Sequence, residues 1–74
     1  MKEIVVNDVY RFRFDRQVTQ EDLANAVGVS RQTIIAIEKG NYTPSVHLAL
    51  DIAAFFKVPV EKIFRIKKKV VEKI

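Results

Sequence analysis

Residues 19–40 read TQEDLANAVGVSRQTIIAIEKG, and this stretch decides the fold. Thr19 and Asp22 fit a capping box, in which a hydroxyl and an acid three residues later each accept a bond from a free backbone N–H at a helix start. Gly28 suits the end of that helix, because glycine adopts a positive φ without strain. Ser30 is placed to cap a second helix. The stretch therefore predicts two short helices joined by a three-residue turn.

Apolar residues lie where two such helices would pack together. The inward positions are Leu23, Ala24 and Val27 on the first helix, Val29 in the turn, and Ile34 and Ile37 on the second helix. A glycine that opens the turn and a hydrophobe at its centre are typical of the helix-turn-helix unit. Generic helix pairs also turn at glycine, so the pattern alone is only moderately specific.

The upstream segment NDVYRFRFDR (7–16) fits two structures. Its aromatic residues alternate with arginines, as in a strand, but the same residues also have helical spacing. Asn7 or Asp8 could cap a helix, and both would be poor inside a strand. The residues of this segment alone favour a strand and a helix equally.

Downstream, Ser45 is placed to cap a long helix, VHLALDIAAFF (46–56). Its apolar face is predicted to run through Val46, Ala49, Leu50, Ala53 and Phe56. Further apolar residues cover much of the rest, so we expect this helix to be the buried centre of the domain. Pro59 suits the first turn of a final short helix, VEKIF (60–64).

The two ends leave alternatives open. Ile63, Ile66, Val70 and Ile74 fit a helical stripe, whereas Ile66, Lys68 and Val70 fit a strand. The β-branched segment KEIVV (2–6) could pair with such a strand.

The 74 residues predict a single domain over 1–74, with a core of about 7–64 and a basic tail over 65–74. The tail carries the whole net charge of +4, so DNA binding does not follow from charge. The absence of cysteine excludes disulfides and thiolate metal sites. The chain has neither a transmembrane run nor an apolar signal-peptide core, so we expect a cytoplasmic protein without membrane contact.

The segment TQEDLANAVGVSRQTIIAIEKGNYTPSVHLALDIAAFFKVPVEKIF (19–64) resembles the DNA-binding domain of the Cro and phage-repressor type, the XRE family of helix-turn-helix regulators. The matching motifs are TQxxLA, the GVS turn, RQTI, the IExG end, the PS cap and the closing IF. Val9, Phe12 and Val18 fall at the family's first-helix core positions. The resemblance implies an all-α, five-helix, lambda-repressor-like domain, helical over 7–16, with short terminal strands still open. It also implies sequence-specific binding of double-stranded DNA by a small transcriptional regulator. From the small size of the chain we expect a repressor that acts by occupancy.

Three positions depart from the family pattern. Gln17 and Lys57 stand where relatives often have glycine, so either helix end is less sharply capped or these residues adopt a left-handed conformation. Ile35 stands where relatives are commonly polar. It could pack at a dimer contact, touch a thymine methyl, or be partly exposed without a special role.

The resemblance makes residues 30–39 the recognition helix. Its expected base readers are Ser30, Arg31, Gln32, Thr33 and Ala36, with Arg31 matched to guanine and Gln32 to adenine. The expected phosphate contacts are Gln20, at the start of the preceding helix, and Lys39, Asn41, Tyr42 and Thr43. Without the resemblance, Arg31 and Gln32 would be taken for ordinary surface residues.

Charged residues of the first helix allow two interpretations. Arg11, Arg13 and Arg16 could contact phosphates, or they could be solvated or paired with Asp8, Asp15 or Glu38. An acid beside a DNA-binding face lowers affinity unless it is neutralised. We therefore expect a structural role for Glu38, paired with an arginine of the first helix.

The expected partners are double-stranded DNA, as a palindromic operator, and a second copy in a homodimer. A protein-docking module or antitoxin that uses the Ile35 face is the alternative. An enzyme is not expected, because His47 has only Asp51 as a helical neighbour, with no nucleophile and no second histidine or cysteine. We expect no cofactor and no metal.

Overall fold

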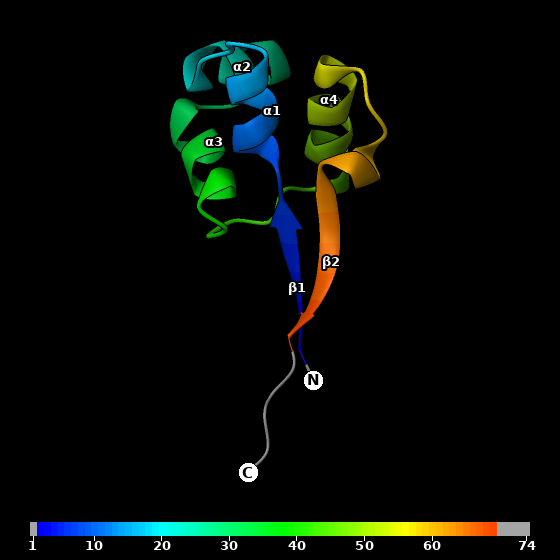
Figure 1. The fold of residues 1–74 in the computed structure, drawn as a ribbon. Coiled ribbons are helices and arrows are strands. Elements are labelled where there is room, and N and C mark those ends of the chain that lie inside the picture. Colours follow the sequence, from blue (N-terminus) through cyan, green and yellow to red (C-terminus); the bar gives the residue numbers. More distant parts are fainter. Residues whose placement is uncertain (1, 70–74) are drawn as a thin grey trace.

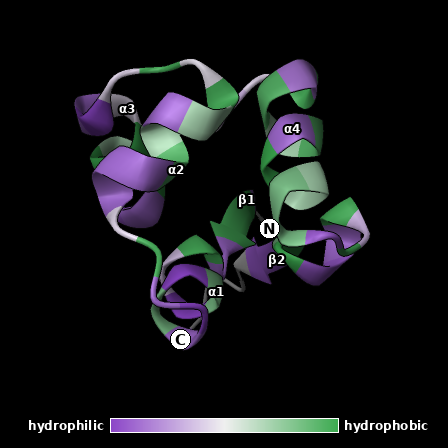
Figure 2. Ribbon diagram, turned by 90° about the horizontal axis from the view of Figure 1, so that it is seen from above, coloured by the Kyte–Doolittle hydropathy of each residue, from purple (hydrophilic) through white to green (hydrophobic). Residues whose placement is uncertain are grey.

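The computed structural model describes residues 2–69, in which the helices gather at one end and a two-stranded ribbon extends from the other (Figure 1). In chain order the elements are β1 (Lys2–Asn7), α1 (Val9–Asp15), α2 (Gln20–Val27), α3 (Arg31–Glu38), α4 (Val46–Phe56), the 3-10 turn η1 (Val60–Lys62) and β2 (Phe64–Lys69). Seen from above in Figure 2, α2 and α3 lie on one side of the ribbon and α4 on the other. None of the helices within these residues is long and apolar enough to cross a membrane.

The prediction of five helices is wrong for this part of the chain, which contains four α-helices. The final helix expected over 60–64 is a single 3-10 turn, because the chain has to leave it at Phe64 to pair with β1. The backbone N–H of Asp8 donates to the carbonyl of Ile63 at 2.9 Å, which joins the end of η1 to the start of α1. Only Ile63 lies between η1 and β2, so the chain has no room there to complete an α-helical turn.

The segment 7–16 is helical from Val9, as the resemblance implied. Asn7 fixes the start: its Oδ1 accepts from the Val9 N–H at 3.1 Å, and its Nδ2 donates to the Ile37 carbonyl at 2.9 Å. Asp8 occupies the cap position without a capping bond, and its carboxylate instead pairs with Arg65 at 2.9 Å. The same asparagine thus starts α1 and attaches it to α3.

The terminal strands that the sequence left open are present. β1 pairs with β2 in antiparallel register, from Lys2 opposite Lys69 to Asn7 opposite Phe64. The alternative of a helical stripe through Ile63 and Ile66 is therefore wrong, while Val70 and Ile74 lie outside the described residues. The fold is mainly helical with a β-ribbon rather than purely all-α.

Ten residues form the buried core: Val9, Leu23, Ala24, Ile34, Ile37, Leu48, Ile52, Ala53, Phe56 and Ile63. The predicted face of α4 needs correction. Ala53 and Phe56 are buried, but Val46 is 76% exposed and Leu50 51% exposed, and Leu48 and Ile52 point inward instead. α4 packs against α2 and η1 through the side that carries its buried residues, so a helix that is apolar nearly all round leaves other apolar residues facing solvent.

The predicted helix caps are confirmed. Thr19 and Asp22 form the capping box, Ser30 accepts from the Thr33 N–H at 3.2 Å, and Ser45 accepts from the Leu48 N–H at 3.1 Å. These bonds satisfy backbone donors that no helical carbonyl can reach.

The two positions at which relatives often have glycine adopt the left-handed conformation. Gln17 has φ of 57° and Lys57 has φ of 60°, after the ends of α1 and α4. A residue with a side chain is strained in this region relative to glycine, so each of the two residues lowers the stability of the fold slightly.

Candidate nucleic-acid interface

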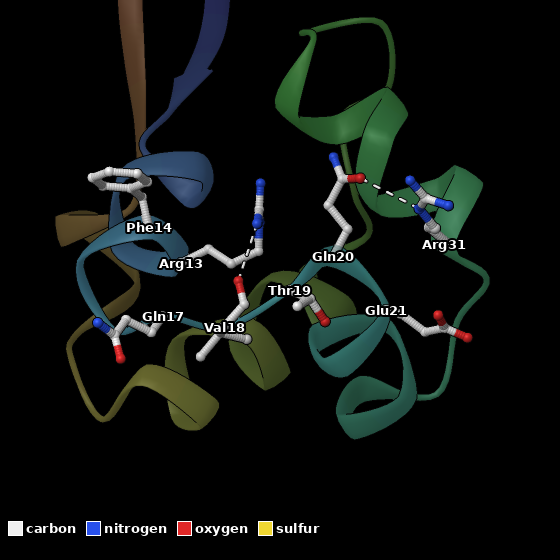
Figure 3. Close-up of a pocket in the computed structure, with 8 residues that line it drawn as sticks. All are labelled: Arg13, Phe14, Gln17, Val18, Thr19, Gln20, Glu21 and Arg31. Carbon is white, nitrogen blue, oxygen red and sulfur yellow. Dashed lines mark hydrogen bonds between the residues drawn. The ribbon is translucent and has the colours of Figure 1, made fainter.

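The turn between α2 and α3 places the two helix starts next to each other. Gly28 has φ of 77°, and the Val29 N–H donates to the Ala24 carbonyl at 3.0 Å, which holds the turn closed. An open cleft of about 770 Å³ lies between the end of α1 and the starts of α2 and α3 (Figure 3). It is lined by Arg13, Phe14, Gln17, Val18, Thr19, Gln20, Glu21 and Arg31.

A hydrogen-bonded chain of four side chains runs along this cleft, and all of them except Glu38 line it. Glu38 is 8% exposed, and its carboxylate accepts from Arg13 Nε at 2.7 Å and from Arg13 Nη2 at 3.1 Å. The same carboxylate accepts from Gln20 Nε2 at 3.1 Å, and Gln20 Oε1 in turn accepts from Arg31 Nε at 3.4 Å. The prediction that Glu38 pairs with a first-helix arginine is confirmed, and the arginine is Arg13.

The chemistry of Glu38 sets the direction of this chain. A carboxylate can only accept, so the amide nitrogen of Gln20 faces it and the amide oxygen is left for Arg31. The bond to Glu38 also raises the pKa of Arg13, whose guanidinium stays charged at any working pH. Arg31 is thus held at the mouth of the cleft through its Nε, while its two Nη groups make no hydrogen bond within residues 2–69. These groups remain available to an acceptor from outside.

The predicted base readers lie at the start of α3, in two environments. Ser30, Arg31 and Gln32 are exposed, whereas Thr33 and Ala36 are half-buried. The hydroxyls of Ser30 and Thr33 lie 3.1 Å apart and also cap the helix, so they are already engaged.

Ile35, one turn further along α3, is half-buried as well. It is not among the exposed large hydrophobic residues of the chain. Partial burial is compatible with each of the three roles expected for this side chain, so its role stays a prediction.

The predicted phosphate contacts do not form one cluster. Gln20 lies at the cleft beside Arg31, whereas the exposed residues Lys39, Asn41, Tyr42 and Thr43 follow the far end of α3. Gln20 also donates to Glu38, the last residue of α3, at 3.1 Å, so its side chain connects the start of the helix to its end. Both ends of the helix therefore carry polar groups able to meet a partner.

Two of the first-helix arginines have structural roles. Arg13 donates to Glu38 and, through Nη1, to the Val18 carbonyl at 3.0 Å. Arg16 donates to the Phe56 carbonyl and lies over the Phe56 ring at 5.6 Å. Arg11 is exposed and remains the first-helix arginine that is free to reach a phosphate.

Sequence reasoning missed Phe14, an exposed residue that lines the cleft across from Arg31 (Figure 3). Its ring stacks on Tyr10 with centroids 6.0 Å apart. The signal was the four-residue spacing of these two aromatics, which places them on the same outward face once the segment is helical.

The fold and the turn define the class of the molecule: a helix-turn-helix domain whose second helix presents its N-terminal end to solvent. The helix-turn-helix family model matches residues 13–63, so the chain belongs to the XRE-type helix-turn-helix family of DNA-binding regulators. Within residues 2–69, no three metal-binding side chains gather closely enough to hold an ion.

Relatives agree with this assignment. An uncharacterised HTH-type transcriptional regulator of Methanocaldococcus jannaschii is 59% identical over 58 residues, covering 78% of this chain and 88% of that protein. The CTXphi transcriptional repressor RstR of Vibrio cholerae is 35% identical over 51 residues, covering 69% of this chain and 46% of that protein. A crystal structure from Bacteroides fragilis shares the fold with a TM-score of 0.77 and 21% identity, over 84% of this chain and 100% of that one.

Proposed function

We propose that this chain binds a specific sequence of double-stranded DNA and represses transcription in the cytoplasm by occupying a palindromic operator as a homodimer. The observation that carries this proposal is the Glu38–Gln20–Arg31 chain, which holds an arginine at the exposed start of the recognition helix. The similarity to a phage repressor supports the repressor role.

In this proposal the start of α3 enters the major groove. A helix with its side chains is about 10–12 Å across and the major groove is about 12 Å wide, so α3 fits into the groove. Its exposed N-terminal face would then point toward the bases. The two Nη groups of Arg31 match O6 and N7 of a guanine, and the amide of Gln32 matches N6 and N7 of an adenine. Ser30, Thr33 and Ala36 supply short contacts beside them.

The hydrogen bond to Gln20 would pre-organise Arg31 for DNA binding. A free arginine loses about 2 kcal/mol of rotamer freedom when it is ordered. Gln20 already restricts Arg31 before DNA arrives, so less of that loss falls on the binding step. Gln20 thus positions the reader, in addition to its predicted phosphate contact at the start of α2.

The phosphate contacts would lie beside the reader. Gln20 bonds both Arg31 and Glu38 from the start of α2. The exposed residues Lys39, Asn41, Tyr42 and Thr43 follow Glu38 at the end of α3. Contacts to the DNA backbone fix the register of the helix but carry no sequence information.

The test compares Arg31→Ala with Lys39→Ala on duplexes that differ by one base pair at a time. Arg31→Ala should remove discrimination of about 1–3 kcal/mol at one base position and leave the preferences elsewhere intact. Lys39→Ala should lower the affinity for all duplexes alike. It should also reduce the slope of log affinity against log salt concentration by about one. If Arg31→Ala also lost affinity equally on every duplex, Arg31 would not be a base reader.

A further inference from the structure

Two aromatic side chains, Tyr10 and Phe14, lie together on the exposed side of α1. Phe14 is 67% exposed and Tyr10 is 57% exposed. Their rings stack with centroids 6.0 Å apart and with 21° between the ring planes. A single exposed hydrophobic residue is ordinary, but adjoining aromatic side chains beside a cleft indicate a contact surface.

Arg13 holds this aromatic pair in place. Its guanidinium lies over the Tyr10 ring, with 5.3 Å between Cζ and the ring centroid. All three guanidinium nitrogens donate, two of them to the Glu38 carboxylate and one to the Val18 carbonyl, so the plane of the group is fixed. Because the face of an aromatic ring attracts a cation, the guanidinium restrains Tyr10, and Tyr10 in turn restrains the ring of Phe14.

Glu38 therefore supports both walls of the cleft. Through Gln20 it holds Arg31, and through Arg13 it holds the aromatic pair. Figure 3 shows Phe14 on one side of the cleft and Gln20 with Arg31 on the other, while Arg13 lies between them. The two walls differ in chemistry, since one presents an aromatic ring and the other presents hydrogen-bond donors.

The backbone of a DNA strand combines the two kinds of surface that these walls would bind. Its phosphate oxygens accept hydrogen bonds, and the carbon-bound hydrogens of deoxyribose form an apolar face. An amide nitrogen carries two hydrogens, so Gln20 keeps one for a phosphate after its bond to Glu38. A phosphate bound there would bring a neighbouring deoxyribose toward the opposite wall, which carries Phe14.

The charges at the cleft agree with this occupant. Among the described residues that line the cleft, Glu21 is the one acid, and in Figure 3 its side chain points away from Phe14. The free donors of Gln20 and Arg31 favour a partner that is rich in acceptors. A strand of DNA has such acceptors at every phosphate.

We infer that Phe14 packs against a deoxyribose of the strand whose phosphate Gln20 binds, and that Tyr10 positions the Phe14 ring for this contact. The inference rests on the proposed DNA binding and adds an apolar contact to it. The contact carries no sequence information, because every deoxyribose presents the same face. It also displaces no counterion, so its contribution to affinity is independent of salt.

The first experiment measures affinity over a range of salt concentrations, on the duplex that the full chain selects from a random pool. Phe14→Ala should lower the affinity about tenfold at every salt concentration, because the apolar area is no longer buried. The slope of log affinity against log salt concentration and the base preferences should both stay as in the wild type. Phe14→Leu should lose less affinity than Phe14→Ala, since it keeps an apolar side chain.

Phe55→Ala is the matched control. It removes the same exposed ring from α4, which lies on the other side of the ribbon from α3 (Figure 2). It should bind as the wild type does, and circular dichroism should show that both alanine variants are folded. Unchanged affinity in Phe14→Ala, or an equal loss in Phe55→Ala, would overturn the inference. A loss confined to one base position, or a reduced salt slope, would also reject a deoxyribose contact.

The second experiment locates the sugar. Each nucleotide of the selected duplex in turn receives a 2′-O-methyl group, and the affinity is measured for the wild type and for Phe14→Ala. The added group crowds a side chain that packs on that sugar. Wild-type binding should therefore be weakened at one nucleotide of each half-site, and Phe14→Ala should be insensitive there. Effects of altered sugar pucker should be the same for both proteins, so identical profiles would contradict the contact.

The positioning role of Tyr10 has its own test. Tyr10→Ala should lower the affinity several-fold in the wild type but have little effect in Phe14→Ala, because no ring is then left to position. Tyr10→Phe keeps the stacked ring and should lose less affinity than Tyr10→Ala. Equal losses from the two substitutions, or an equal effect of Tyr10→Ala in both backgrounds, would reject this role.

The failure of this inference can be separated from failure of the proposed function. If the full chain selects a motif that Arg31→Ala relaxes, while Phe14→Ala binds with wild-type affinity, only the deoxyribose contact is wrong. If the full chain selects no duplex, the proposed function and this inference fail together.

Discussion

Glu38→Gln should destabilise the fold far more than a surface carboxylate does. The change keeps the shape of the side chain but removes the charge that faces Arg13, whose side chain is only 12% exposed. Loss of one partner of a fully buried ion pair costs about 3–5 kcal/mol, because the other charge is left uncompensated. The Arg13–Glu38 pair is partly buried, so the lower end of this range applies. We expect about 3 kcal/mol here, since Arg13 keeps its bond to the Val18 carbonyl.

That loss is large for a chain of this size. At roughly 0.05–0.15 kcal/mol per residue, the free energy of unfolding of a 74-residue domain is about 4–11 kcal/mol. Urea unfolding followed by helical circular dichroism measures the change. With a slope of about 1.5 kcal/mol per molar urea, the midpoint should fall by roughly 2 M at unchanged slope. Protein concentration has to be fixed, because dimerisation would add to the apparent stability.

The matched control is Asp8→Asn, which removes a carboxylate at 2.9 Å from Arg65 in a more exposed pair. It should cost at most about 1 kcal/mol, because solvent screens such pairs. Replacing Arg13 by Met and Glu38 by Leu together should cost less than Glu38→Gln alone, since no buried charge remains. A Glu38→Gln loss no larger than that of Asp8→Asn would show that burial does not strengthen the Arg13–Glu38 pair.

Three further changes give predictions for the same unfolding assay. Lys57→Gly should raise stability by up to about 1 kcal/mol, because glycine removes the left-handed strain at φ of 60°; a clear loss would mean that the lysine makes a favourable contact. Ser45→Ala should cost about 1 kcal/mol through the lost bond to the Leu48 N–H, and an unchanged midpoint would show that water replaces the cap. Ile52→Ala should cost about 2–5 kcal/mol, and a loss below 1 kcal/mol would contradict the inward face assigned to α4.

The features predicted from sequence are those that depend on near neighbours. The capping box at Thr19, the Ser30 and Ser45 caps and the turn at Gly28 need only three or four residues, and the structure has all of them. The exposed start of α3 follows from the same local signals, because Ile34 and Ile37 fix which side of the helix points inward.

The features missed from sequence depend on distant parts of the chain. The residues of α4 are apolar nearly all round, so periodicity could not choose between a face through Leu50 and one through Ile52. Only the positions of α2 and η1 decide that choice. Likewise, the strand at Phe64 exists because β1, nearly sixty residues earlier, pairs with it. For the site, Glu38 was expected to bind a first-helix arginine. Which arginine it binds depends on the side of α1 that faces α3, and this side carries Arg13.

Selection of bound duplexes from a random pool tests the central claim most directly. The full chain should enrich an inverted repeat whose half-sites are centred about 10 bp apart, each with a conserved G·C pair. Arg31→Ala, selected in parallel, should enrich the same repeat with that one position relaxed. Enrichment of no sequence by the full chain, or identical motifs from both proteins, would contradict the assignment of α3 and Arg31 as the reader of DNA sequence.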